Sequence, residues 1–211
     1  RRSAAWRLRR VASRSSRNTS TSTAPTFPSL RTISTLPTPC ACFTTSTTLT
    51  PSAFAPGAGV TLTASAVTGI NGDTGFQTTD VGRLIRIKQT NVWGYCLITG
   101  WTSTTVVTVT IINTLTSTAA KLDWRLGAWS DTTGYPGAVT FYEDRLVFGG
   151  APNAPHRVDG SKTGVYENFS PTGTDGVVAN DNAISFTLNA STVNRICWLA
   201  DDESGLLIGT S

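Results

Sequence analysis

Residues 104–112 read TTVVTVTII, and this stretch is the strongest local indication of the fold. Nearly every position carries a β-branched side chain, which loses rotamer freedom in a helix and packs well on a pleated sheet. Valine, leucine and alanine alternate with threonine over residues 60–64, and further strands are expected at residues 81–88 and 93–101. Residues 44–122 are therefore predicted to form a small β-barrel or β-sandwich domain.

A second series of short strands is expected over residues 123–211. Residues 139–142 and 145–148 are predicted to pair across a tight turn at Glu143 and Asp144. Later strands are expected at residues 157–159, 183–188, 193–199 and 206–209. Short antiparallel strands at this pitch are typical of sandwiches and of propeller blades. The chain is thus predicted to be all-β, ending in the first blades of an incomplete β-propeller-like domain that residue 211 cuts short.

The net charge of +4 averages two unlike segments. Residues 1–72 contain eight arginines and no acid, whereas residues 73–211 contain nine basic and thirteen acidic side chains, a net charge of −4. Residues 1–43 are rich in Arg, Ser, Thr and Pro and lack apolar periodicity, so they are predicted to be disordered or aberrant, as a frameshifted translation would be. A nucleic-acid-binding arm and a targeting segment are the alternatives for this stretch.

The motifs of several site classes are missing. The single histidine, His156, excludes a multi-histidine zinc site, and the sequence has neither a P-loop nor a G-x-S-x-G elbow. Neither enzymatic activity nor a metal or cofactor is expected. Cys96 and Cys197 are predicted to be buried thiols within strands. Arg83 and Arg86 are predicted to be exposed edge or rim positions, with contact to an anion as the alternative.

Aromatic residues are concentrated in the second half of the chain. Stacking on single-stranded nucleic acid would need interleaved lysine or arginine, and this region is acidic. Core packing and contact between subunits are therefore the favoured roles. The residues concerned are Trp124, Trp129, Tyr135, Phe141, Phe148, Tyr166, Phe169 and Trp198.

Seven motifs in this half resemble those of the tail nozzle, or tail tubular protein B-like, proteins of short-tailed bacteriophages and prophages. They are WRLGAWS (124–130), GYP (134–136), FYEDRLVFGG (141–150), APHRV (154–158), SKTGVYENF (161–169), VNRICWL (193–199) and LLIGTS (206–211). Within them, the positions taken as structural family residues are Trp124, Gly127, Trp129, Ser130, Gly134, Tyr135, Pro136, Arg145, Leu146, Phe148, Gly149, Gly150, Tyr166, Phe169 and Trp198.

The first half resembles a small β domain that these proteins often carry. Its motifs are TLTPSA (48–53), GVTLTAS (59–65) and TDVGRLIRI (79–87). That domain is similar to the first catalytic cysteine half-domain of ubiquitin-activating enzyme, a likeness of fold without ubiquitin chemistry. Residues 1–43 depart from the family pattern, which has ordinary globular sequence there.

The resemblance implies a structural virion protein without catalytic activity. Such a subunit self-associates into a ring, six-fold in the family, contacts portal and adaptor proteins, and forms a conduit through which DNA passes without specific binding. It would be located in the virion tail after assembly in the bacterial cytoplasm. A weakly acidic lumen would repel phosphate. The candidate channel-facing acids are Asp131, Glu143, Asp144, Asp175, Asp181 and Asp201.

Two other functions are compatible with the residues. The first is a carbohydrate-binding or glycoside-hydrolysing β-propeller, in which Trp129, Tyr135 and the carboxylates of the 143–144 hairpin line a sugar site. The second is a nucleic-acid-binding protein that acts through its basic N-terminal segment.

Overall fold

The computed structural model describes residues 46–113, 115–189 and 194–211. These residues form twelve β-strands and one short 3₁₀ helix at Thr78–Asp80, which confirms the all-β prediction. Within the same ranges, no helix has the length and apolar character needed to cross a membrane. The expectations for residues 1–43 lie outside the described residues.

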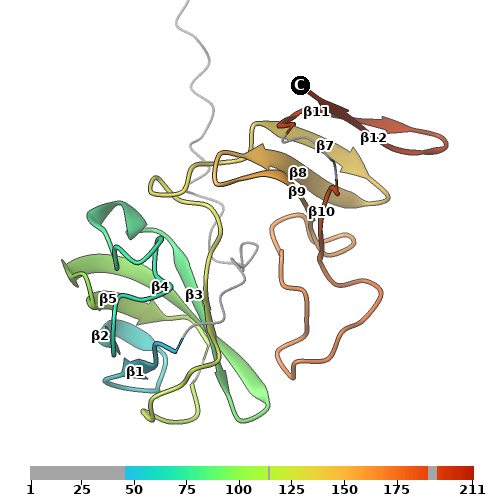
Figure 1. The fold of residues 1–211 in the computed structure, drawn as a ribbon. Coiled ribbons are helices and arrows are strands. Elements are labelled where there is room, and N and C mark those ends of the chain that lie inside the picture. The colour runs from blue at the N-terminus through green and yellow to red at the C-terminus, as the bar shows by residue number, and fades with distance from the viewer. Residues whose placement is uncertain (1–45, 114, 190–193) are drawn as a thin grey trace, which may run out of the picture.

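The first six strands form one curled antiparallel sheet (Figure 1). Its spatial order is β1-β2-β5-β4-β3-β6. The strands are β1 (Leu49–Pro51), β2 (Gly57–Ala64), β3 (Leu84–Gln89), β4 (Val92–Ser103), β5 (Val106–Ile111) and β6 (Trp124–Leu126). Leu49 in β1 exchanges two backbone hydrogen bonds with Lys121, which precedes β6, at N···O distances of 2.8 and 3.0 Å. The two edges of the sheet therefore approach one another, as in a partly closed barrel.

The alternating pattern of the strands sends one face of this sheet into the core. Ile85 and Ile87 in β3, together with Val107 and Val109 in β5, are fully buried there. Trp124 in β6 belongs to the same core, and its indole Nε1 donates a hydrogen bond to the carbonyl oxygen of Thr47 at 2.9 Å. The first sheet thus extends past the domain boundary predicted after residue 122.

The next four strands form a second antiparallel sheet in which neighbours in sequence are neighbours in space. They are β7 (Ala138–Tyr142), β8 (Arg145–Ala151), β9 (Ala154–Gly160) and β10 (Ile184–Thr187), in the order β10-β9-β8-β7. The predicted hairpin of β7 and β8 is confirmed. Its turn residues Glu143 and Asp144 both have positive φ, 46° and 56°, as a two-residue type I′ turn requires.

The last two strands, β11 (Ile196–Asp202) and β12 (Gly205–Thr210), form a separate hairpin. A two-stranded ribbon is marginal alone, and this one packs Ile196 and Leu199 against Ala138, Val147 and Val158 of the second sheet. In Figure 1 the hairpin lies beside β7 and β8.

The prediction for the second cysteine was wrong, because Cys197 is exposed, whereas Cys96 in β4 is buried as expected.

A long segment, residues 161–183, connects β9 to β10 within the second sheet and also contacts the first sheet. In Figure 1 it leaves the second sheet and runs beside β3 and β4. The backbone N–H of Trp93 donates to the carbonyl oxygen of Thr174 at 2.7 Å, and the hydroxyls of Tyr95 and Ser170 lie 3.0 Å apart. These bonds hold the segment against the outer face of the first sheet.

Candidate functional site

The motif aromatics divide into a buried set and an exposed set. Trp129 is packed edge-on against Phe148 and Phe169, with ring centroids 5.0 and 5.3 Å apart, and Tyr135 and Leu146 are packed against this cluster. By contrast, Phe141, Tyr166 and Trp198 are 58%, 40% and 53% exposed. The buried aromatics therefore pack in the core, whereas the exposed ones are accessible for contact between subunits.

Several motif residues shape turns and close approaches. The Ser130 Oγ accepts hydrogen bonds from the N–H groups of Thr132 and Thr133 at 3.1 and 3.2 Å, and Gly134 closes that turn with a φ of 82°. A Cβ at Gly150, where φ is 71°, would collide with the carbonyl oxygen of Ile196. The other small motif residues lie close by in the sequence. Gly127 precedes Ser130 by three residues, Pro136 follows Gly134 by two, and Gly149 adjoins Gly150.

Arg145 fixes the start and end of the long connecting segment. Its buried guanidinium donates to the carbonyl oxygens of Ser161, Asn180 and Asn182 at 2.6, 2.8 and 2.6 Å. Charge-assisted hydrogen bonds of this kind are stronger than neutral ones. The position of Arg145 directly after the hairpin turn thus sets the path of residues 161–183.

All six candidate channel acids are exposed, and they are spread over loops, the β7–β8 turn and β11. Asp144 accepts a hydrogen bond from the Tyr166 hydroxyl at 2.6 Å, and Asp181 forms an ion pair with Lys162 at 2.8 Å. Glu143 and Asp201 lie close enough to Tyr142 to add to the rise in its pKa, whose largest cause is desolvation. Asp131 and Asp175 lie in separate loops.

Arg83, predicted to be an exposed rim residue, is instead buried in a polar network, so that prediction was wrong. Its guanidinium lies 2.9 Å from the Asp80 carboxylate, 2.7 Å from Asn71 Oδ1, and donates from Nε to the carbonyl oxygen of Gly127. Asp80 in turn accepts from Thr132 Oγ1 at 2.8 Å. Burial lowers the pKa of Arg83, and the charge of Asp80 opposes that change. The network joins the first sheet to the turn that leads into the second.

Arg86, also predicted to be exposed, is only 4% exposed, so that prediction was wrong as well. It lies on the outer face of the first sheet, where its guanidinium carbon is 4.0 Å from the centroid of the Trp93 ring. One of its terminal nitrogens donates to Thr172 Oγ1 in the connecting segment. Its Nε is buried and has no hydrogen-bond partner among the described residues.

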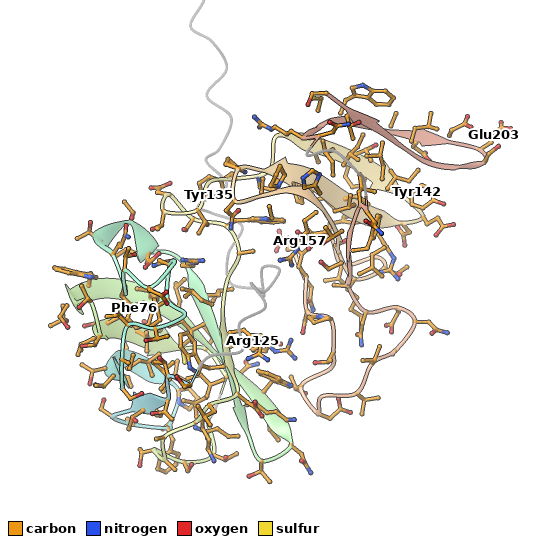
Figure 2. The ribbon with its side chains drawn as sticks, viewed as in Figure 1. Phe76, Arg125, Tyr135, Tyr142, Arg157 and Glu203 are labelled. Carbon is orange, nitrogen blue, oxygen red and sulfur yellow. The ribbon has the colours of Figure 1, made fainter. Side chains whose placement is uncertain are left out.

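A pocket of about 480 Å³ opens between the two sheets at this arginine. Arg86 and Arg125 line it from β3 and β6, Arg157 and Asp159 line it from β9, and residues of β10 and the connecting segment complete it. In Figure 2, Arg125 and Arg157 lie on opposite sides of the space between the sheets. Arg157 Nε is 2.8 Å from Asp159 Oδ1 and 3.0 Å from Ser185 Oγ. Burial raises the pKa of Asp159, and Arg157 counteracts the rise.

The sugar site expected in the alternative prediction is not assembled in the described parts of the chain. Trp129 is buried, Glu143 and Asp144 occupy an exposed hairpin turn, and none of them lines the 480 Å³ pocket. No group of three or more His, Cys, Asp or Glu side chains that could hold a metal occurs among the residues described. Burial raises the pKa of the Cys96 thiol to about 12, which keeps it protonated and unreactive.

Sequence reasoning did not find the pocket, although one signal was present. Arg86 and Arg125 interrupt apolar strands, and arginine is rarely fully buried without a partner.

No protein-family model matches the sequence. A search of curated proteins also finds no match.

Proposed function

We propose that this protein is a structural subunit of a phage tail nozzle, a ring that encloses the path of DNA ejection. The proposal draws on the resemblance of residues 124–211 to the nozzle family. It includes self-association into a ring, six-fold as in the family, contact with portal and adaptor proteins, and location in the virion tail after assembly in the bacterial cytoplasm. It assigns no catalytic role to the chain.

The observation that carries the proposal is the exposed aromatic set. Phe141 of β7 and Tyr166 of the connecting segment form an edge-on pair with centroids 5.2 Å apart, and both remain exposed. Trp198 of β11 and Leu207 of β12 are also about half exposed. Large apolar side chains exposed on a surface are a common feature of protein interfaces.

The architecture of the second half is compatible with this role. The sheet β7–β10 is a four-stranded meander, the arrangement of a propeller blade, and the following hairpin begins a further sheet. Among the described strands, β12 pairs only with β11, so its other edge is available for another strand. The interpretation of residues 123–211 as propeller blades belongs to this proposal.

Replacing Phe141 and Trp198 together with serine is expected to shift the protein from oligomer to monomer. Each substitution removes an exposed aromatic side chain, and such side chains contribute about 2 kcal/mol or more at the centre of an interface. Sedimentation velocity over a concentration series measures the change. Phe54→Ser is the matched control, because Phe54 is 50% exposed but lies in the loop between β1 and β2 of the first sheet. Oligomers unaffected by the double substitution would contradict this interface.

The body of the protein is expected to bind double-stranded DNA only weakly. The six candidate channel acids are exposed and the net charge of residues 73–211 is −4, from nine basic and thirteen acidic side chains, so phosphate is repelled. Fluorescence anisotropy of labelled DNA, with the full chain and with residues 44–211 compared over a salt series, measures this. Tight, salt-sensitive binding by residues 44–211 would contradict a non-adhesive lumen.

A further inference from the structure

The pocket between the two sheets is positively charged, although the region that contains it has a net negative charge. Three guanidinium groups and one carboxylate line it, a formal charge of +2, whereas residues 73–211 carry a net charge of −4. Its apolar lining includes Trp93, Phe169 and Phe186. This combination of cations and flat apolar surfaces differs from the acidic exterior around it.

The positions of Arg86 and Arg125 are costly without a counter-charge. These residues are direct cross-strand partners in β3 and β6, and like charges placed opposite one another destabilise a sheet. Arg86 is almost fully desolvated, and among its polar atoms Nε has no partner. The contact with the Trp93 ring offsets part of this cost.

The remaining charges in the pocket do not neutralise that pair. Asp159 is the one acidic residue in the lining, and its Oδ1 already accepts from Arg157 Nε at 2.8 Å. The described hydrogen bond of the Arg125 guanidinium is to the carbonyl oxygen of its neighbour Trp124, at 2.7 Å. An oxyanion between Arg86 and Arg125 would supply the missing charge-assisted hydrogen bonds.

We propose that this pocket binds a small organic anion, a carboxylate or phosphate carried on a flat ring. The arginines from the first sheet would hold the oxyanion, with Arg157 facing them from the second sheet. The ring would lie against the apolar lining, which includes Trp93 and Phe186. A volume of about 480 Å³ accommodates a ligand of this size. This binding function is additional to the proposed structural role and does not depend on it.

Isothermal titration of the full chain with phenyl phosphate, benzoate, inorganic phosphate and phenol tests the proposal. Phenyl phosphate or benzoate is expected to bind saturably, with a dissociation constant of about 1 mM or tighter. Inorganic phosphate should bind about fivefold or more weakly, because it lacks the ring. The preferred anion of the first two identifies the oxyanion as phosphate or carboxylate. Absence of saturable binding by both, or equal binding of phenol, would overturn the proposal.

Arg125→Gln is expected to weaken binding of the better probe at least about tenfold, since it removes a charge-assisted hydrogen bond. Because Arg125 is half-buried, Arg125→Gln is expected to fold. Arg86→Gln changes a buried residue, so its binding is measured together with its unfolding curve. Lys88→Gln is the matched control, because Lys88 lies two residues from Arg86 in β3 but does not line the pocket. Affinity unchanged by Arg125→Gln, or reduced equally by Lys88→Gln, would show that the probe does not bind between these arginines.

Discussion

Replacing Asp80 with alanine is expected to lower the free energy of unfolding by about 3–5 kcal/mol. The substitution leaves the Arg83 guanidinium buried without its carboxylate partner 2.9 Å away. It also removes the acceptor for Asn71 Nδ2 at 2.7 Å, for the Gln77 N–H at 2.9 Å and for Thr132 Oγ1 at 2.8 Å. Urea unfolding followed by tryptophan fluorescence measures the loss.

Two comparisons separate the network from a general effect of removing a carboxylate. Asp123→Ala removes an exposed carboxylate and should change stability by no more than about 0.5 kcal/mol. The double substitution Asp80→Leu with Arg83→Met should recover part of the loss, because it leaves no unpaired buried charge. A loss below about 1 kcal/mol for Asp80→Ala would be too small for a buried ion pair that is broken.

Replacing Trp124 with alanine is expected to cost about 3–5 kcal/mol, the range for large aromatic residues in cores. Trp124 is 1% exposed, is packed beside Phe76 with ring centroids 6.4 Å apart, and bonds through Nε1 to Thr47. Thermal and urea unfolding both measure this loss. Because β6 is an edge strand of only three residues, we expect its pairing with β3 to be lost with the side chain.

Trp124→Phe distinguishes packing from hydrogen bonding. It keeps most of the apolar volume but removes the hydrogen bond from Nε1 to the Thr47 carbonyl oxygen, so it should cost about 1–3 kcal/mol. Trp101→Ala is the control, since Trp101 is 41% exposed and its loss removes less buried surface. Equal losses for Trp124→Ala and Trp101→Ala would contradict the central position of Trp124 in the first core.

The strands and hairpins were predictable because their signals are local. The β-branched run at residues 104–112 contains β5, and the acidic pair Glu143 and Asp144 occupies the turn between β7 and β8. In both cases neighbouring residues determine the backbone conformation.

The environment of the arginines was not predictable from local sequence. Arg83 and Arg86 are buried by Gly127 and Thr172, which lie 44 and 86 residues further along the chain. Nothing in the run DVGRLIRI indicates that a later loop covers its outer face. The pocket was not predictable for the same reason, because Arg86 and Arg157, which line it, come from different sheets.

The exposure of Cys197 has a different cause. Simple alternation along β11 would place one set of side chains inside, but the pairing with β12 shifts register between Ile196 and Trp198. The irregularity leaves Ile196 and Leu199 buried and both Cys197 and Trp198 exposed. A bulge of this kind changes the facing of residues without any distinctive composition.

Electron cryo-microscopy of the full-length protein tests the proposed ring most directly. We expect closed rings of identical subunits, with Phe141, Tyr166 and Trp198 at the contacts between neighbours and exposed acids such as Glu143 and Asp201 facing the central channel. Isolated monomers at every concentration would contradict it. So would rings in which these aromatic residues remain exposed to solvent.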